Sequence, residues 1–519
     1  MPANAYQFST KRMSLQILLS DFVADQDLGL EGLMVSGLSL DSRTVSKGDL
    51  FFALKGAQHD GLSFIKTAKE RGAVSVVTDA PALNDDFITD LDIPVVQVPG
   101  LKKSLGEIAA RFFDNPSRHM DVVGITGTNG KTSCCQFIAQ ALGRLEVPCA
   151  VIGTNGYGAI NELHDFGQTT PDPIMLQRIL AELLGEKFQV IAMEVSSHGL
   201  DQGRTNGVRF NTAIFTNLTR DHLDYHGDMK AYGESKAKLF SHTEIKQAII
   251  NVDDPFGRQL ADKVKAPIKV YRYAVDDQTA DVSVSNIKIT NGRTRALVRS
   301  PWGSGIVSSP LLGRFNISNL LAAFTYLCAQ GITLDRALGA VADLDTVDGR
   351  MQRFGGDSLP VIVVDYAHTP DALKSVLITL REICPGKLWC VFGCGGNRDK
   401  GKRGMMGRFA EQYADQVVLT NDNPRQENPE DIIRDIKAGM KRPADAQIIL
   451  NRVTAIQETI ASAGENDLVL IAGKGHEGYQ EIGGARFAFN DGEQVKQALT
   501  IKRAVKQNSM QNNHDDDTT

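Results

Sequence analysis

The chain has 519 residues, of which 42% are hydrophobic and 23% charged, and its formal net charge is −6. This length predicts two to four domains, and the ordinary balance of apolar and charged residues excludes disorder as the main state. The acidic balance argues against a dedicated nucleic-acid binder. Since the sequence has neither an apolar run long enough to span a membrane nor the apolar segment of a secretory signal, we expect a soluble cytoplasmic protein.

Residues 1–119 form the first predicted domain. Its expected strands are short apolar runs at residues 50–54, 73–78 and 94–98. Residues 102–113 carry apolar side chains at helical spacing, and the Asn115-Pro116 pair that follows should end this helix at a domain boundary.

Residues 120–350 form the second predicted domain, in which strand-like runs alternate with helical segments. The expected strands lie at residues 122–126, 150–153, 190–195, 212–217 and 248–251. This alternation predicts a mostly parallel sheet covered by helices on both faces. Over residues 282–307 apolar and polar residues alternate around Asn291-Gly292, a strong hairpin signal, which predicts an antiparallel addition.

Residues 351–505 form the third predicted domain. A helix is expected at residues 370–383, and strands are expected at residues 361–365, 388–392, 417–420, 447–450 and 468–471. This pattern is typical of a doubly wound α/β domain. Residues 506–519 are mostly polar and are predicted to be a disordered tail.

The strongest local signal is GITGTNGKT, from Gly124 to Thr132, between an expected strand and an expected helix. Backbone N–H groups of a glycine-rich turn and a helix N-terminus bind phosphate oxygens. Lys131 would reach the β- and γ-phosphates, and the Thr132 hydroxyl would hold Mg²⁺. The strict G-x-x-x-x-G-K spacing is not met because position 125 is Ile, so a plain glycine-rich turn is the alternative.

Polar residues follow further strands, where ligands of parallel sheets bind. Glu194 is a candidate magnesium ligand, with a helix cap as the alternative. The segment 221–227, DHLDYHG, could be a zinc site or a plain polar turn, but hard oxygen ligands with one histidine suit the magnesium of a phosphate loop better. Asp365 could accept hydrogen bonds from ribose hydroxyls.

Two segments of the third domain indicate anion binding. Residues 398–403 hold four cationic side chains, which form either a solvated face or an anion site. In DNPR (422–425), Arg425 follows a strand and could bind a carboxylate with two parallel hydrogen bonds, although a stiff turn is the alternative. The glycines at 393–396 lack the third glycine of a dinucleotide fingerprint, so NAD binding is not expected.

Taken in order, these motifs resemble those of the Mur ligases over about residues 14–505. The similar segments are DSR (41–43), GDLFFALKG (48–56), GITGTNGKTS (124–133), TTPD (169–172), MEVSSHGLDQGR (193–204), NLTRDHLDYHG (217–227), FNISNLLAA (315–323), DGRMQ (348–352), VDYAHTPDAL (364–373), GCGGNRDKGKR (393–403), DNPR (422–425) and AGKGHE (472–477). The resemblance implies a three-domain α/β architecture with a central phosphate-loop ATPase domain and a doubly wound C-terminal domain.

The resemblance also implies an activity in peptidoglycan precursor synthesis. It is ATP-dependent amide ligation, which adds meso-diaminopimelate to the D-Glu γ-carboxylate of UDP-MurNAc-L-Ala-D-Glu through an acyl phosphate, with Mg²⁺ as cofactor. We expect a monomer that acts on these small molecules, without nucleic acid or membrane partners.

By the same resemblance, each ligand has a set of expected contacts. UDP-MurNAc-dipeptide would contact Leu40, Ser42, Ala57, Gln58, His59, Thr169, Thr170, Ser196, Gln202 and Arg204. ATP would contact Gly127, Thr128, Asn129, Gly130, Lys131, Thr132, Asn316, Asn319, Arg350 and Asp365. Diaminopimelate would contact Arg398, Asp422, Asn423, Pro424, Arg425, Gly473 and Glu477. The expected magnesium ligands are Thr132, Glu194, His222 and Lys236, and the expected catalytic residues are Lys131, Glu194, His222 and Lys236.

Lys236 matches a lysine that Mur ligases carry as an N-carboxylated (carbamylated) residue. A bare ammonium beside Mg²⁺ and phosphates would be repelled, whereas a carbamate is an anionic oxygen ligand. Arg425 bears on the choice of amino acid, because diaminopimelate carries a second carboxylate that lysine lacks.

Three other functions compete with this one. A lysine-adding ligase of the same kind is the nearest, and folylpolyglutamate synthase shares a similar ATPase core but lacks the motifs of the first domain. A nucleotide-dependent switch without ligase activity is the third, and Glu194, His222 and Lys236 together argue against it.

Overall fold

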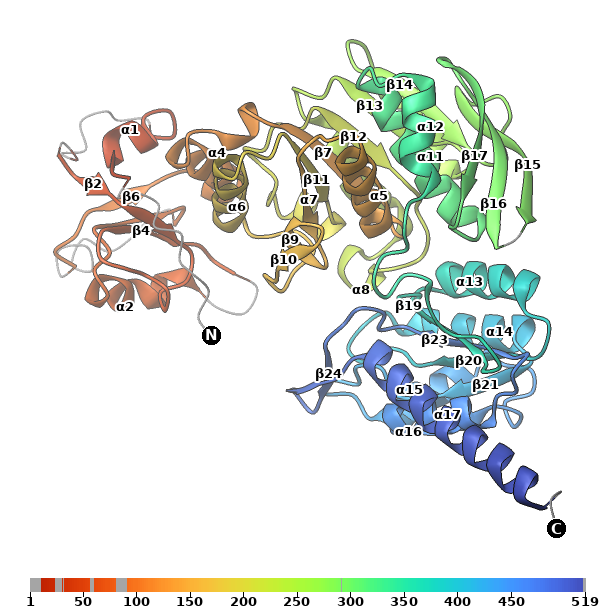
Figure 1. Cartoon of the computed structure of the whole chain (residues 1–519). Helices are drawn as coiled ribbons and strands as arrows, with labels where there is room; N and C mark the ends of the chain where they lie inside the picture. Colours follow the sequence, from red (N-terminus) through yellow and green to blue (C-terminus); the bar gives the residue numbers. More distant parts are fainter. Residues whose placement is uncertain are drawn as a thin grey trace. The chain divides into compact units, whose positions relative to one another are not determined.

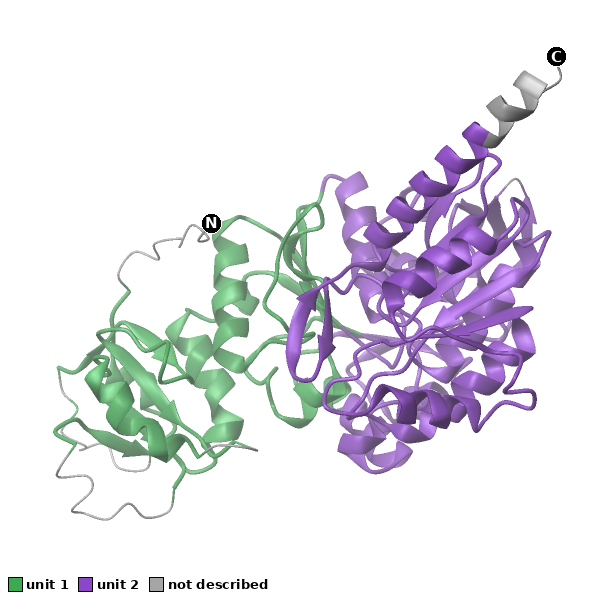
Figure 2. Ribbon diagram, turned by 90° about the horizontal axis from the view of Figure 1, so that it is seen from below, with its two compact units in different colours: residues 1–124, 147–213, 238–245 green, residues 125–146, 214–237, 246–519 purple. Residues whose placement is uncertain are grey.

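The computed structural model describes residues 11–23, 30, 32–56, 60–80, 91–290 and 292–516, with side chains up to residue 508. The chain divides into two compact units (Figure 2). The first comprises residues 1–124, 147–213 and 238–245, and the second comprises residues 125–146, 214–237 and 246–519. None of the helices in the described part of the chain is long and apolar enough to cross a membrane.

The first unit begins with a four-stranded parallel sheet in the order β3-β4-β5-β6. Its strands are β3 (Gly37–Ser39), β4 (Asp49–Ala53), β5 (Ser75–Thr78) and β6 (Val95–Gln97). Around it lie β1 (Met13–Ser14), α1 (Leu15–Leu19), β2 (Met34–Val35), η1 (Gly61–Phe64), α2 (Ile65–Glu70) and α4 (Leu101–Phe112). Leu105 and Ile108 of α4 share a core with Phe52 of the sheet. The three expected strands and the helix are confirmed, and the helix ends just before Asn115 and Pro116.

A second set of strands has the order β10-β9-β8-β11-β7 and lies in this unit, except for the last two residues of β7, which belong to the second unit. They are β7 (Asp121–Thr126), β8 (Cys149–Gly153), β9 (Gly156–Ala159), β10 (Glu162–His164) and β11 (Val190–Glu194), with η2 (Pro116–Arg118), α6 (Pro173–Gly185), α7 (Ser197–Asp201) and η3 (Lys238–Ser241). β8 and β11 are parallel, whereas β9 and β10 are antiparallel neighbours that the sequence did not predict.

The next strands form the series β12-β13-β14-β15-β16-β17 (Figure 1). They belong to the second unit, except for the first half of β12, which belongs to the first. The strands are β12 (Thr212–Phe215), β13 (Gln247–Asn251), β14 (Lys269–Ala274), β15 (Val282–Thr290), β16 (Arg293–Ser300) and β17 (Gly303–Ser309). The helices are α5 (Lys131–Arg144), α8 (Leu223–His226), α9 (Met229–Ala237), α10 (Pro255–Lys263), α11 (Arg314–Ala329) and α12 (Leu334–Ala342). β15, β16 and β17 are antiparallel, so the expected addition is confirmed, although Asn291 lies outside the described residues.

The rest of the second unit is built on a six-stranded sheet in the order β18-β19-β23-β20-β21-β22, parallel except for β18. The strands are β18 (Gln352–Gly355), β19 (Val361–Asp365), β20 (Leu388–Phe392), β21 (Gln416–Leu419), β22 (Gln447–Ile448) and β23 (Leu468–Ala472). The helices are α13 (Pro370–Ile383), η4 (Lys400–Lys402), α14 (Arg403–Tyr413), α15 (Pro429–Lys437), α16 (Arg452–Ser462) and α17 (Asp491–Asp516). Separate apolar cores, one with α13, α14 and α15 and one with α16 and α17, cover the two faces, which confirms the doubly wound prediction.

Two features of this region differ from the sequence analysis. A hairpin of β24 (Tyr479–Ile482) and β25 (Ala485–Ala488) was not predicted. The tail expected to be disordered from residue 506 is helical as far as Asp516, because α17 continues through it. The residues of the tail are mostly polar, and its Lys and Gln residues can extend a helix that has already begun without a new nucleation step.

Arg452 and Asp491 form a fully buried ion pair, in which Nε and Nη2 donate to the two carboxylate oxygens at 2.8 Å each. We expect Arg452→Met to lower the free energy of unfolding by about 3–5 kcal/mol, because it leaves an unpaired buried carboxylate. Chemical denaturation measures this. Arg434→Met, which removes a solvent-exposed pair with Asp431, is the control and should cost no more than about 1 kcal/mol. Equal losses in the two variants would contradict the argument.

Candidate active site

The glycine-rich turn after β7 has the shape of a phosphate-binding loop. Gly130 has φ +87°, and a Cβ there would lie 2.5 Å from Oδ1 of Asn319; at Gly127 a Cβ would lie 1.9 Å from Oγ1 of Thr216. Side chains are therefore excluded at both positions. α5 begins directly at Lys131, so its N-terminal N–H groups and partial positive charge adjoin the turn.

Two lysines donate to this turn. Nζ of Lys131 lies 2.9 Å from the carbonyl oxygens of Gly127 and Thr128, and Nζ of Lys236, on α9, lies 2.8 Å from that of Gly127. Lys236 is only 1% exposed, and none of the described carboxylates lies within ion-pair distance of it. Burial, and then the positive charge of Lys131, hold the pKa of Lys236 well below its usual value. Burial therefore disfavours the charged ammonium form at this position.

The Tyr232 ring connects Lys236 with His222. Nζ of Lys236 lies 4.4 Å from the centroid of the ring, and the imidazole of His222 lies 6.1 Å from it, centroid to centroid. The Tyr232 hydroxyl lies 3.2 Å from Oγ1 of Thr128. Lys236 and His222 thus both lie near the Tyr232 ring, and Lys236 also bonds to the glycine-rich turn. Tyr232 was not among the site residues expected from the sequence.

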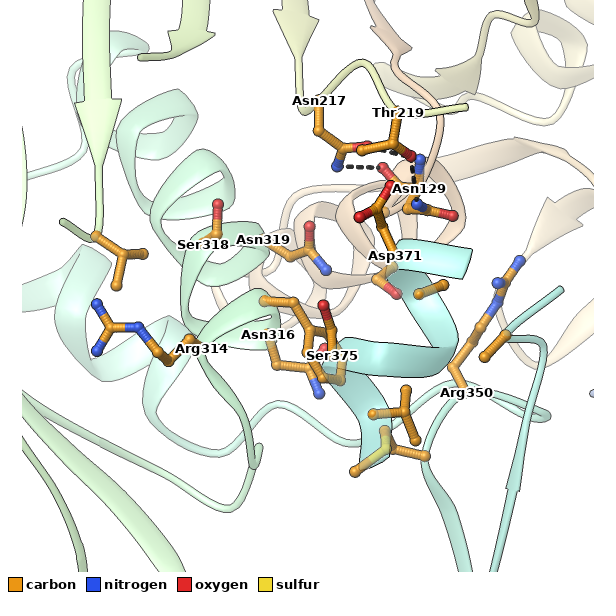
Figure 3. Close-up of a pocket in the computed structure, with 18 of the residues that line it drawn as sticks. Asn129, Asn217, Thr219, Arg314, Asn316, Ser318, Asn319, Arg350, Asp371 and Ser375 are labelled. Atoms are coloured by element: carbon orange, nitrogen blue, oxygen red, sulfur yellow. Dashed lines mark hydrogen bonds between the residues drawn. The ribbon is translucent and has the colours of Figure 1, made fainter. Parts of the chain in front are cut away.

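A cavity of about 290 Å³ opens next to the loop (Figure 3). Six of the ten expected ATP contacts line it: Asn129, Gly130, Asn316, Asn319, Arg350 and Asp365. The other four, Gly127, Thr128, Lys131 and Thr132, belong to the adjoining turn and the start of α5. Further lining residues that were not predicted include Asn217, Thr219, Asp253, Arg314, Asp371 and Ser375.

Arg350 and Asp365, which line this cavity, are fixed by contacts with neighbouring residues. Nη2 of Arg350 donates to Oγ1 of Thr132 at 3.1 Å, and its guanidinium lies 4.3 Å from the centroid of the Tyr366 ring. The Asp365 carboxylate accepts a hydrogen bond from the backbone N–H of Met351 at 2.7 Å. Burial raises the pKa of Asp365, against the opposing effect of Arg350.

In the first unit, polar side chains gather around the end of β11. Glu194 is buried, and its carboxylate accepts from the backbone N–H of Thr154 at 2.9 Å and from the Thr154 hydroxyl at 3.2 Å. The Thr154 hydroxyl also lies 3.1 Å from that of Thr169, while the Thr170 hydroxyl donates to the backbone oxygen of Glu194 and accepts from the backbone N–H of Ser196.

Arg204 extends the same group. It donates to Oε1 of Gln202 through Nε and Nη2 at 2.9 and 2.7 Å, and to the backbone oxygen of Thr170 at 2.8 Å. Five of the expected dipeptide contacts are thereby brought together. Leu40 and Ser42 lie in the segment that follows β3, and Ala57, Gln58 and His59 lie outside the described residues.

The expected amino-acid site lies at the carboxyl end of the C-terminal sheet. Arg425 has a left-handed backbone (φ +55°), and its N–H and C=O bond to Glu481 and Gly483 of the β24–β25 hairpin. Its Nη1 donates to the backbone oxygen of Gly396 at 2.9 Å, and its Nε lies 3.5 Å from a carboxylate oxygen of Glu481. The described contacts of the Arg425 side chain thus involve Nη1 and Nε. None of them involves Nη2, which could therefore bind a ligand.

The other members of this site are close together. Asn423 Nδ2 donates to Glu477 Oε2 at 2.9 Å, and a Cβ at Gly473 would lie 2.6 Å from the Asp422 carboxylate. A Cβ added at Gly395 would come within 4 Å of both Arg398 and Arg425. The prediction missed Glu481, because the hairpin that carries it has no strong turn signal beyond Gly483-Gly484.

The polar segment after β12 bonds to the C-terminal part of the same unit. The buried Asp221 carboxylate lies 3.2 Å from Nζ of Lys402 and 3.3 Å from Nε2 of both His368 and His222. Arg220 pairs with Asp399 through two hydrogen bonds of 2.9 and 3.0 Å.

These contacts account for much of the basic run at 398–403. Lys402 is buried against Asp221, and the buried Arg403 pairs with Glu427 and Asp435. The interpretation as a wholly solvated face is therefore wrong, because two of the four cationic side chains are buried in ion pairs. The other two, Arg398 and Lys400, are exposed.

The zinc alternative for residues 221–227 gains no support. Across the described ranges, no three His, Cys, Asp or Glu side chains converge as a metal site of those residue types requires. That finding does not apply to the expected magnesium site, because two of its four ligands, the Thr132 hydroxyl and a carbamate on Lys236, are of other residue types than His, Cys, Asp and Glu. The other two expected ligands are Glu194 and His222. Hydroxyl, carboxylate and carbamate oxygens with one imidazole suit Mg²⁺ chemically. Lys236, whose charged form is disfavoured by burial, lies beside the glycine-rich turn, with Nζ 2.8 Å from the carbonyl oxygen of Gly127.

Comparison with known proteins agrees with this geometry. Residues 34–113 match the family described as "Mur ligase family, catalytic domain", residues 125–327 match "Mur ligase middle domain", and residues 349–475 match "Mur ligase, glutamate ligase domain". Two relatives named UDP-N-acetylmuramoyl-L-alanyl-D-glutamate–2,6-diaminopimelate ligase are similar along nearly their full length. The one from Coxiella burnetii is 47% identical over 90% of this chain and 96% of its own, and the one from Pseudomonas aeruginosa is 46% identical over 90% and 95%.

Solved structures give the same result. A structure described as that diaminopimelate ligase matches with a TM-score of 0.68 and 36% identity, over 95% of this chain and 100% of its own. MurF from Thermotoga maritima in complex with ADP matches in fold, with a TM-score of 0.61 and 18% identity over 90% and 98%. The mixed α/β fold class predicted from the sequence is confirmed. The chain therefore belongs to the Mur ligase family.

Proposed function

We propose that this chain is a UDP-N-acetylmuramoyl-L-alanyl-D-glutamate–2,6-diaminopimelate ligase. It joins the γ-carboxylate of D-Glu to an amine of meso-diaminopimelate and converts ATP to ADP and phosphate. The observation that carries the proposal is the 47% identity to a relative of that name over 90% of the chain. The geometry around Lys131 and Arg425 supplies chemistry suited to each half of the reaction.

In the first half, an oxygen of the γ-carboxylate attacks the γ-phosphorus of ATP. The bond from phosphorus to the β–γ bridging oxygen breaks, which gives an acyl phosphate and ADP. Lys131 and the N-terminus of α5 stabilise the charge that the phosphoryl oxygens and the leaving ADP develop. Lys131 is held over the turn by carbonyl oxygens, which a phosphate would replace as its partners.

In the second half, a neutral amine of diaminopimelate attacks the acyl carbon. The C–N bond forms, the C–O bond to phosphate breaks, and the amine proton is released. Arg425 orients the amino acid through its second carboxylate, while Asn423 and Glu477 bind elsewhere on the same molecule. Closing the site keeps water away from the acyl phosphate.

Magnesium would be held by Thr132, Glu194, His222 and Lys236 as its carbamate. When bound, it neutralises the negative charge of the phosphates. Thr132 is kept in place by Arg350, and Glu194 by Thr154.

The remaining predictions complete the proposal. Residues 1–119, 120–350 and 351–505 would be three domains that bind the UDP moiety, ATP and the amino acid. Thr169, Thr170, Ser196, Gln202 and Arg204, at the end of β11, would contact the muramyl-dipeptide. The enzyme would act as a cytoplasmic monomer.

Phosphate release tests the proposed function. Purified protein is given ATP, Mg²⁺ and UDP-MurNAc-L-Ala-D-Glu with meso-diaminopimelate, with lysine or with no amine. Release should be fastest with diaminopimelate and should require the dipeptide substrate. Faster ligation of lysine would assign the lysine-adding function, and nucleotide hydrolysis that ignores both substrates would indicate a switch.

Arg425→Ala should lower the preference for diaminopimelate over lysine by more than tenfold in kcat/KM. The variant removes charged hydrogen bonds to the carboxylate that lysine lacks, each worth about 1.5–3 kcal/mol. Arg434→Ala, an exposed arginine on α15, is the matched control and should keep the wild-type ratio. A ratio unchanged in Arg425→Ala would refute the carboxylate-binding role.

A further inference from the structure

One buried lysine has no part in the function proposed above. Lys474 follows Gly473 in the AGKGHE segment, and its side chain is 0% exposed. A buried ammonium is costly unless anionic or polar groups compensate it. The partners of this one are two side chains of the expected diaminopimelate site.

Lys474, Asn423 and Glu477 form a closed triangle of hydrogen bonds. Nζ of Lys474 donates to Oδ1 of Asn423 at 3.0 Å and to Oε2 of Glu477 at 2.7 Å. Nδ2 of Asn423 donates to the same Oε2 at 2.9 Å. Oδ1 of Asn423 also accepts from the backbone N–H of Glu481 at 2.9 Å, which fixes which way the amide faces.

The triangle leaves one atom of Glu477 for a ligand. Both donors bind Oε2, and among the described contacts no protein donor reaches Oε1. The Glu477 side chain is 20% exposed, so Oε1 can meet an ammonium group of an amino acid. Lys474 thereby orients Glu477 through Oε2 and leaves Oε1 for the ammonium group of the amino acid.

Lys474 also changes the charge of the site. Its ammonium lies 2.7 Å from Oε2 of Glu477 and offsets the negative charge of that carboxylate. Diaminopimelate carries two ammonium and two carboxylate groups at neutral pH, whereas lysine carries a net charge of +1. Without Lys474 the site would carry one more negative charge and would favour a cation such as lysine.

We propose that Lys474 is a positioning residue for amino-acid selection. It fixes Asn423 and Glu477 and cancels one negative charge, so that the site takes a doubly zwitterionic amino acid over a cationic one. This inference rests on the proposed function, because it concerns the same amino-acid site.

Two variants separate orientation from charge. Lys474→Met removes both the hydrogen bonds and the charge, whereas Lys474→Gln keeps an N–H donor, one bond closer to the backbone, without the charge. Initial rates of amide formation are measured with wild type and each variant, varying diaminopimelate, lysine and ATP in turn, and thermal unfolding is followed in parallel. Lys502→Met is the matched control, since Lys502 donates to the carbonyl oxygens of Ala461 and Ala463 in the same sheet domain.

Lys474→Met should raise the KM for diaminopimelate at least tenfold, while the KM for ATP stays within twofold. In both Lys474 variants the ratio of kcat/KM for diaminopimelate to kcat/KM for lysine should fall at least fivefold. The KM for diaminopimelate should rise less in Lys474→Gln than in Lys474→Met. The Lys502→Met control should keep both wild-type values.

An unchanged selectivity ratio in a folded Lys474→Gln would overturn the inference, as would equal rises in the KM values for ATP and diaminopimelate. If Lys474→Met does not fold, Lys474→Gln alone decides the charge argument by its ratio. A wild-type protein that ligates neither amino acid would instead reject the proposed function, which keeps the two failures apart.

Discussion

Lys131→Ala should abolish ligation while leaving the fold intact, with kcat/KM lowered by about three orders of magnitude or more. The Lys131 ammonium lies over the glycine-rich turn, where its bonds to two carbonyl oxygens hold it ready for phosphate. Its loss removes a full positive charge from the place where the phosphoryl group is transferred. Rates of ADP formation with both co-substrates saturating provide the measurement.

The fold is checked separately, since a destabilised protein would also be inactive. Arg144→Ala on the same helix, α5, removes a side chain that donates to the backbone oxygen of Asp343, far along the helix from the turn. This control should ligate at nearly the wild-type rate, and the circular dichroism and melting temperature of Lys131→Ala should match those of wild type. Near-normal turnover of Lys131→Ala would refute the phosphate-loop assignment.

Lys236→Ala should lose about two to three orders of magnitude in kcat, because a carbamate that holds magnesium would be missing. Acetate or formate should restore part of this activity, since a small carboxylate can occupy the space left by the carbamate. Two observations motivate the experiment: burial lowers the pKa of Lys236, and none of the described carboxylates lies within ion-pair range of it.

The neighbouring Lys238→Ala serves as the control. Lys238 is half exposed and pairs with Asp201 at 2.7 Å, so its removal should change neither the rate nor the response to acetate. Mass spectrometry of rapidly handled wild-type protein should in addition show a 44-dalton adduct that is lost in acid, as expected for carbon dioxide on an amine. Full activity of Lys236→Ala without added carboxylate would eliminate the carbamate.

The elements that the sequence predicted best are the buried parallel strands. β19 and β23 are continuous apolar runs with glycine or polar residues at their ends, and this pattern has few other interpretations. α4 was equally clear, because Leu105, Ile108 and Phe112 mark one face of it. The hairpins β9–β10 and β24–β25 were missed, since their side chains are largely half buried or exposed and leave little periodic signal.

Site residues could be predicted where a motif carries its own geometry. The glycines before Lys131 are required by contacts with Thr216 and Asn319 that lie far away in sequence, yet their pattern is local and readable. Tyr232 could not be found in this way, because its role depends on a ring held between His222 and Lys236. Lys474 belonged to a quoted motif, but only the fold shows that its ammonium faces Asn423.

Residues of α11 and α13 line the cavity beside the phosphate loop. Other residues of α13 pack into the core of the C-terminal sheet. A small molecule lodged there would tie these two helices to each other. If ATP binds in this cavity, as proposed above, the molecule would displace the nucleotide and would also restrict movement of one helix against the other. Such an inhibitor could be found by a rise in melting temperature even where its competition with ATP is weak.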